Sequence, residues 1–109
     1  MLQDRFAKGV DWTGYEQAKR TRWQHQLHLF HVPFYYIEYG IAQLGALQVW
    51  KRSLENPAEA LALYKKALSL GGTRGLADLF TAAGGRFDMG EETIRPLIEK
   101  VREEWAAAV

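Results

Sequence analysis

Residues 56–72, NPAEALALYKKALSLGG, contain every signal expected of a single α-helix. Asn56 is a favoured N-cap, Pro57 suits the first helical position, and Glu59 stands in the first turn. Apolar residues recur three and four positions apart, and Gly71-Gly72 supplies a left-handed stop. The pattern therefore predicts an amphipathic helix that fills the whole interval.

Two further helices are predicted on the C-terminal side of this one. The first covers about 73–83 and ends at Gly84-Gly85. A cap-like start at 88–91 precedes the second, which either begins near Thr93 or has an irregular first turn, because Pro96 cannot donate a helical hydrogen bond. Its apolar residues share one face: Ile94, Leu97, Ile98, Val101 and Trp105.

On the N-terminal side, residues 34–52 predict a helix with apolar side chains all the way round. Such a helix is expected to be buried on several sides. Gly40 and Gly45 each cost about 1 kcal/mol relative to alanine inside a helix, so close packing against neighbouring segments is expected to compensate.

Residues 13–30 predict another helix, started by a capping box of Thr13 and Glu16. Pro33 ends it, because the residue before a proline avoids the α region. Its apolar stripe consists of Trp23, Leu27 and Phe30.

No segment alternates as a half-buried strand does. We therefore predict an all-α fold of about five helices in a compact, bundle-like array. The 109 residues predict a single helical domain, with a loose N-terminal arm over 1–12 and the helical segment over 13–109.

Charge and composition exclude several classes of protein. Fourteen Lys plus Arg against thirteen Asp plus Glu leave a net charge of +1, which predicts no binding of nucleic acid or of an anionic membrane. The longest nearly uncharged stretch, 32–50, is too polar for a spanning helix. Absence of cysteine excludes disulfides, thiol catalysis and cysteine-ligated zinc, and it fits a cytoplasmic protein.

Three histidines, His25, His28 and His31, are spaced so that neighbours could share a metal on a helix. No Asp, Glu or Cys stands beside them to complete a ligand shell, and no His-Glu pair occurs anywhere in the sequence. We therefore expect polar positions at the end of an exposed helix, and no metal site in this chain.

The most unusual composition is that of residues 30–39, FHVPFYYIEY, of which five are aromatic. Buried tyrosine hydroxyls need hydrogen-bond partners, so Tyr35, Tyr36 and Tyr39 suggest a polar-lined cavity or groove. The alternative is an aromatic core layer with its hydroxyls at the rim. Glu38 is expected at that rim, or as a partner for an arginine.

Four motifs carry a resemblance to a known family: HLF at 28–30, PFYYIEYGIAQ at 33–43, YKKALSLGGT at 64–73 and LFTAAG at 79–84. Together they resemble the C-terminal part of the oligoendopeptidase F and thimet oligopeptidase family of zinc metallopeptidases. The resemblance extends from about Trp23 to Trp105.

The resemblance implies a mostly helical fold with a channel for short peptides. One wall of that channel carries zinc on His-Glu-x-x-His and a downstream glutamate, and the opposite wall carries a histidine and tyrosines. The histidine matches His28 best, with His31 as the close alternative. Tyr36 is the expected oxyanion donor, a role worth about 3 kcal/mol in comparable enzymes, and His31, Tyr35 and Tyr39 are the expected peptide-binding residues.

The zinc-binding motif of the family is missing from this sequence. The chain is therefore expected to be the substrate-binding, oxyanion-stabilising segment of such a peptidase, inactive alone and without a cofactor of its own. The expected partners are short peptides, together with either a zinc-bearing N-terminal part or a second copy of the chain.

Two other functions compete with this one. A non-catalytic helical module could bind peptides or drive oligomerisation. A tetratricopeptide protein would use the helix over 57–70, but no second copy of a 34-residue repeat is present. In either case an incompletely covered apolar helix predicts a homo-oligomer, most simply a dimer, that buries parts of Phe30, Phe34, Tyr35 and Trp50.

Overall fold

The computed structural model describes residue 5 and residues 8–108 of the chain. These residues form six α-helices, α2 to α7, and two short 3-10 helices, with no strand among them, so the predicted all-α fold is confirmed. The chain divides into two compact units, residues 1–37 and residues 38–109. Half of the predicted N-terminal arm, residues 1–4, 6 and 7, lies outside the described residues, and the single domain stays a prediction.

The first unit contains three short helical pieces where one helix over 13–30 was predicted. They are α2 (Glu16–Thr21), the 3-10 helix η1 (Arg22–His25) and α3 (His28–His31). None has a buried residue, so tertiary packing, which supplies most of the stability of helices in proteins, is missing. The Thr21 hydroxyl also donates to the Gln17 carbonyl at 3.1 Å and competes with the backbone ladder.

The predicted capping box at Thr13 and Glu16 is wrong. The Thr13 hydroxyl donates to the Asp11 carboxylate at 2.7 Å, and the Glu16 carboxylate accepts from the backbone N–H of Gly14 at 3.0 Å. Tyr15 precedes α2 without a side-chain cap. Asp11 takes the place of the helical amide as the partner of Thr13 because its carboxylate is only two residues away. The same carboxylate accepts from the Thr13 N–H, which forms an Asx-type turn.

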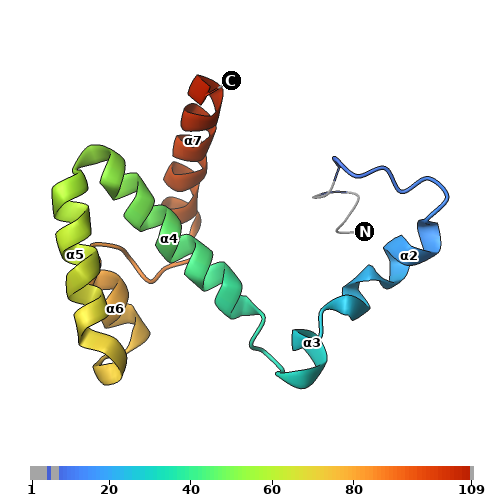
Figure 1. Ribbon diagram of the computed structural model, residues 1–109, viewed down its shortest axis with the longest axis horizontal. Coiled ribbons are helices and arrows are strands. Elements are labelled where there is room, and N and C mark those ends of the chain that lie inside the picture. The colour runs from blue at the N-terminus through green and yellow to red at the C-terminus, as the bar shows by residue number, and fades with distance from the viewer. Residues whose placement is uncertain (1–4, 6–7, 109) are drawn as a thin grey trace. The chain divides into compact units, whose positions relative to one another are not determined.

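The second unit is organised by α4 (Ile37–Glu55) and α5 (Pro57–Leu70), which form a tight hairpin at Asn56 (Figure 1). The Asn56 side chain accepts from the Glu59 N–H at 3.2 Å, and Gly71 ends α5 with a φ of 52°. The helix predicted over residues 56–72 is confirmed at both ends, because its cap and its stop both act locally.

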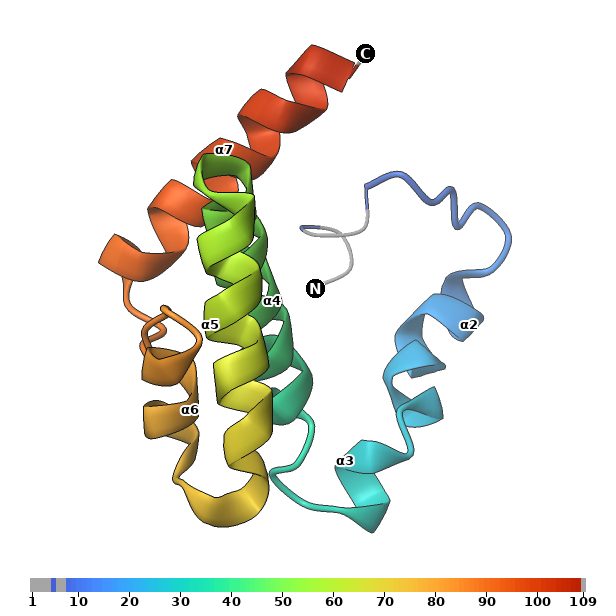
Figure 2. The ribbon, with the colours of Figure 1, turned by 60° about the vertical axis from the view of Figure 1, so that its left-hand side comes forward.

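After α5, the 3-10 helix η2 (Gly71–Thr73) leads into α6 (Leu76–Ala82), which packs beside α5. The last helix, α7 (Glu91–Ala108), crosses α4, and its C-terminal half extends past the α4–α5 hairpin (Figure 2). It begins at Glu91, before Thr93. Its first turn is tightened, since the Thr93 N–H bonds the carbonyl of Gly90, three residues back, at 3.1 Å. The irregular first turn was one of the two predicted alternatives for the helix that contains Pro96.

Two side chains of α4, one helical turn apart, hold the loop between α6 and α7. Gln48 hydrogen-bonds the backbone of Arg86, and the Arg52 guanidinium donates to the Gly84 carbonyl at 3.2 Å. Gly84 has a φ of 78°, and a Cβ there would lie 2.8 Å from Arg52 Nε. The loop is therefore tied to α4 at Gly84 and at Arg86, two residues further along.

The prediction that α4 is buried on several sides is wrong for the described chain. None of its residues is buried, although most of those from 47 to 53 are half-buried. The close approach expected at its glycines occurs at Gly45, where a Cβ would lie 2.9 Å from Phe80 Cζ. The buried apolar residues of the described chain are Ala60 and Leu97, so α4 is only partly covered by α5, α6 and α7. No described helix is long and apolar enough to cross a membrane.

Candidate functional site

His28, Tyr35 and Tyr36 form an aromatic cluster in the first unit. The ring of His28 lies nearly parallel to that of Tyr35, with centroids 6.4 Å apart and planes 15° apart. The Tyr36 ring is tilted by 49° to His28 at a centroid distance of 5.9 Å. The structure thus brings together the histidine and two of the three tyrosines that the sequence singled out.

The turn between α3 and α4 places the two tyrosines beside His28. It contains Phe34, whose φ of 66° makes it the only non-glycine residue with a positive φ in the described chain. The Tyr35 N–H bonds the Val32 carbonyl at 3.1 Å, which closes the turn. Phe34 is 96% exposed, so no packing of its own side chain explains this unfavourable conformation. The left-handed conformation of Phe34 turns the chain back toward α3.

The Tyr36 hydroxyl donates a hydrogen bond to Gln26 Oε1 at 3.2 Å. This distance is long for an O–H···O bond, and the pair is exposed, so the hydroxyl can exchange Gln26 for another acceptor at small cost. Gln26 is not among the predicted site residues. No local pattern could have found it, because its contact depends on the break between η1 and α3.

The other two predicted site residues stand on two different helices. His31 is exposed at the C-terminal end of α3. Tyr39 stands in the first turn of α4 and belongs to the second unit. Of the two candidate histidines, His28 is therefore the one in ring contact with the tyrosines.

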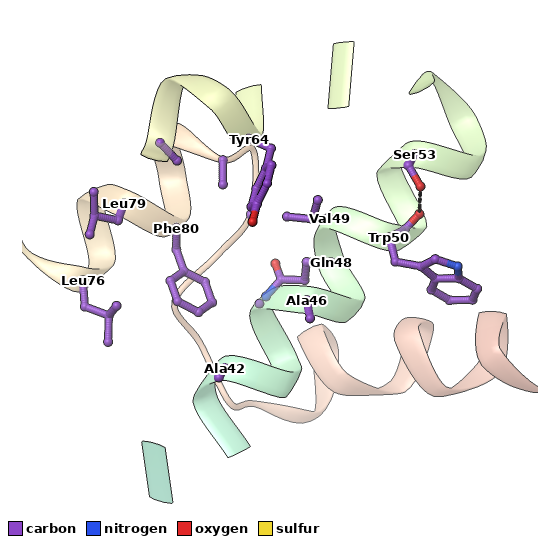
Figure 3. A pocket seen from close by; sticks show the side chains of 14 residues that line it. Ala42, Ala46, Gln48, Val49, Trp50, Ser53, Tyr64, Leu76, Leu79 and Phe80 are labelled. Atoms are coloured by element: carbon purple, nitrogen blue, oxygen red, sulfur yellow. Dashed lines mark hydrogen bonds between the residues drawn. The ribbon is translucent and has the colours of Figure 1, made fainter. Parts of the chain in front are cut away.

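An apolar pocket of about 630 Å³ lies between α4, α5 and α6 (Figure 3). Its α4 wall carries small residues, among them Ala42, Gly45 and Ala46, while Tyr64 and Phe80 project toward α4 from the opposite side. None of the five predicted site residues lines it. The small residues of α4 predicted close packing against neighbouring segments, and no pocket was predicted there.

A second groove, of about 490 Å³, runs between α4 and α7. Leu47 and Trp50 line its α4 side, and Val101 and Trp105 line its α7 side. Trp50 also lines the pocket between α4, α5 and α6, so one indole borders both spaces.

The residues present do not fit the zinc ion that the resemblance implies. Across residue 5 and residues 8–108, no group of three or more His, Cys, Asp or Glu side chains could hold a metal ion. The aromatic cluster around His28 offers one imidazole and two neutral phenols, a set suited to hydrogen bonding and stacking. It contains no carboxylate to share a divalent cation.

Comparison with known families gives one match. The model of peptidase family M3 matches residues 2–97, which is most of the chain. Comparisons with curated proteins and with solved structures gave no match. The matched range includes the whole aromatic cluster and all of α4, α5 and α6. This chain belongs to peptidase family M3, a family of metallopeptidases.

Proposed function

We propose that this chain supplies the peptide-binding and oxyanion-stabilising wall of a peptidase that cleaves short peptides. The observation that carries the proposal is the contact of His28 with both Tyr35 and Tyr36, within a chain of peptidase family M3. These residue types bind a peptide backbone through stacking and hydrogen bonds, and they need no charge to do so.

Each residue of the cluster has a distinct proposed role. Tyr36 donates a hydrogen bond from its hydroxyl to the oxyanion that forms when the peptide carbonyl is attacked. A neutral donor aimed at developing negative charge lowers the barrier more than it tightens substrate binding. His28 supplies a second donor, while Tyr35, together with His31 and Tyr39, contacts the peptide on either side of the cleaved bond.

The group that activates water lies outside these residues in this proposal. No His-Glu pair occurs in the sequence, so the zinc of the family belongs to a further polypeptide part that carries His-Glu-x-x-His. We assign the chain to the oligoendopeptidase F branch because of the run Phe34-Tyr35-Tyr36-Ile37-Glu38-Tyr39. The absence of cysteine supports a cytoplasmic location.

Peptide binding by the purified chain tests this role without requiring cleavage. A fluorescently labelled nonapeptide of mixed sequence is titrated with the chain, and its anisotropy is followed. Binding should weaken at least several-fold in His28→Ala and in Tyr35→Ala. The matched control is His25→Ala, an exposed histidine of η1 that has no part in the cluster. Equal weakening by both histidine variants would refute the assignment.

The alternative function, a non-catalytic peptide-binding module, is favoured by the apolar pocket between α4, α5 and α6. In that case a bulky residue placed in the pocket, Ala42→Trp, should abolish peptide binding. Ala62→Trp, on an exposed position of α5 that does not line the pocket, is the control. Binding that depends on Ala42 and not on His28 would favour the module over the peptidase wall.

A further inference from the structure

The exposed face of α7 carries an apolar stripe bordered by charges of alternating sign. Ile94 and Ile98 are 37% and 43% exposed, whereas Leu97, on the side of α7 that meets the rest of the unit, is 4% exposed. A groove of about 490 Å³ follows this face. Its charged lining, in chain order, is Glu91, Arg95, Glu99 and Arg102.

This order of charges is complementary to itself when the helix is turned end for end. If two copies of α7 lie antiparallel with their centres near residues 96 and 97, position 91 of one copy lies opposite position 102 of the other. Position 95 then lies opposite position 99, to within one residue. Each pairing places a glutamate opposite an arginine. In the same arrangement Ile94 faces Ile98, so apolar residues also meet apolar residues.

In a parallel twofold pair, the charged side of one helix would lie on the opposite side of the pair from that of the other, so the charges would not meet. The antiparallel arrangement brings both charged sides together with opposite charges in contact, so the pattern favours it. A twofold axis generates this geometry, because an isologous interface brings the same patch of each subunit together. The pattern on α7 is thus that of a surface that fits a second copy of itself.

We propose that two copies of this chain associate through antiparallel packing of their α7 helices. Ile94 of each copy packs on Ile98 of the other, and Glu91 and Arg95 pair with Arg102 and Glu99 of the second copy. This interface differs from the contacts at Phe30, Phe34, Tyr35 and Trp50 that the sequence predicted, and it does not rest on the proposed peptidase role.

Two charge-reversal variants test the self-complementarity. Arg102→Glu sets glutamate against Glu91 of the second copy, and Glu91→Arg sets arginine against Arg102, in each case at two places in the dimer. Each variant alone should weaken dimerisation about tenfold or more, measured by sedimentation velocity over a concentration series. An equimolar mixture of the two should regain a dimer of wild-type affinity, because both contacts are then between opposite charges.

Three controls separate this interface from the others. Lys65→Glu, on the exposed surface of α5, should leave the dimer unchanged. Phe34→Ser should also leave it unchanged, and circular dichroism should show full helix content in every variant. A monomer at tens of micromolar would overturn the proposal. So would a dimer that Phe34→Ser abolishes, or single variants that are not rescued by mixing.

Discussion

The side-chain amide of Gln48 bonds the backbone of Arg86 in both directions. Its Nε2 donates to the Arg86 carbonyl at 2.9 Å, and its Oε1 accepts from the Arg86 N–H at 2.7 Å. Both backbone groups of Arg86 are therefore satisfied by one side chain from a helix 38 residues away in sequence. This pair is one of two side-chain links between α4 and the loop that leads to α7, the other being the bond from Arg52 to the Gly84 carbonyl.

Gln48→Ala should lower the free energy of unfolding by about 1–3 kcal/mol, because it removes two hydrogen bonds to the Arg86 backbone, each with a net contribution of about 0.5–1.5 kcal/mol. Urea denaturation followed by circular dichroism measures the loss. Gln43→Ala, an exposed glutamine of the same helix, is the matched control and should change stability little. Equal effects of the two substitutions would show that the Arg86 contact contributes nothing.

Replacing glycine by alanine should have opposite effects at Gly84 and Gly40. At Gly84 the positive φ and the nearby Arg52 make a Cβ unfavourable, so we expect a loss of about 1–2 kcal/mol. At Gly40, in α4, nothing lies within 4 Å of a Cβ, so alanine should stabilise by about 0.5–1 kcal/mol. Thermal melts of both variants check the signs. Stabilisation at Gly84 would contradict the loop geometry.

The start of α7 should weaken in acid. The Thr93 hydroxyl, followed by the Gly90 N–H, holds the pKa of the Asp88 carboxyl below its ordinary value of 3.8. In the unfolded chain the Asp88 carboxyl has its ordinary, higher pKa and binds a proton more readily. The contribution of Asp88 to stability is therefore fully present above that ordinary pKa. It is lost as the pH falls through the lowered pKa of the folded state.

The measurement is the urea midpoint between neutral and strongly acidic pH. Asp88→Asn should flatten the acid side of that profile relative to the wild type, while Asp78→Asn, an acid of α6, serves as the control. If the acid side of the profile is the same in Asp88→Asn as in the wild type, Asp88 does not cause the loss of stability in acid.

Tyr36→Phe should leave the fold intact, whereas Leu47→Asp should not. The tyrosine loses one long, exposed hydrogen bond to Gln26, a cost below about 1 kcal/mol. Leu47→Asp puts a carboxylate into the groove between α4 and α7, which should cost at least about 2 kcal/mol. Thermal melts compare the two. A Tyr36→Phe variant as unstable as Leu47→Asp would make Tyr36 a structural residue.

The purified chain should show no peptidase activity on a short fluorogenic peptide, with or without added zinc. The proposed oxyanion donors require a metal that activates water, and the described residues offer no cluster of ligands for one. Zinc-dependent cleavage that survives repeated purification would contradict this, and stoichiometric zinc binding in calorimetry would point to His25, His28 and His31.

Sequence predicted best those elements whose ends are fixed by local chemistry. The limits of α5 follow from Asn56, Pro57 and Gly71, each of which acts on its own turn. The helix over 13–30 failed because its continuity depends on packing that residues 16–31 do not have. A periodic pattern records which face could be buried, but not whether anything covers it.

Part of the candidate site could be predicted because it also depends on local structure. His28, Tyr35 and Tyr36 lie within nine residues, so one turn at Phe34 suffices to join them. The Gln26 and Arg86 contacts depend on a broken helix and on a distant loop. Neither leaves a periodic or compositional trace in the sequence.

Trp50 stands between the pocket of α4, α5 and α6 and the groove of α4 and α7. An occupant of either space would therefore contact the same indole. The emission of this one side chain would register the entry of either.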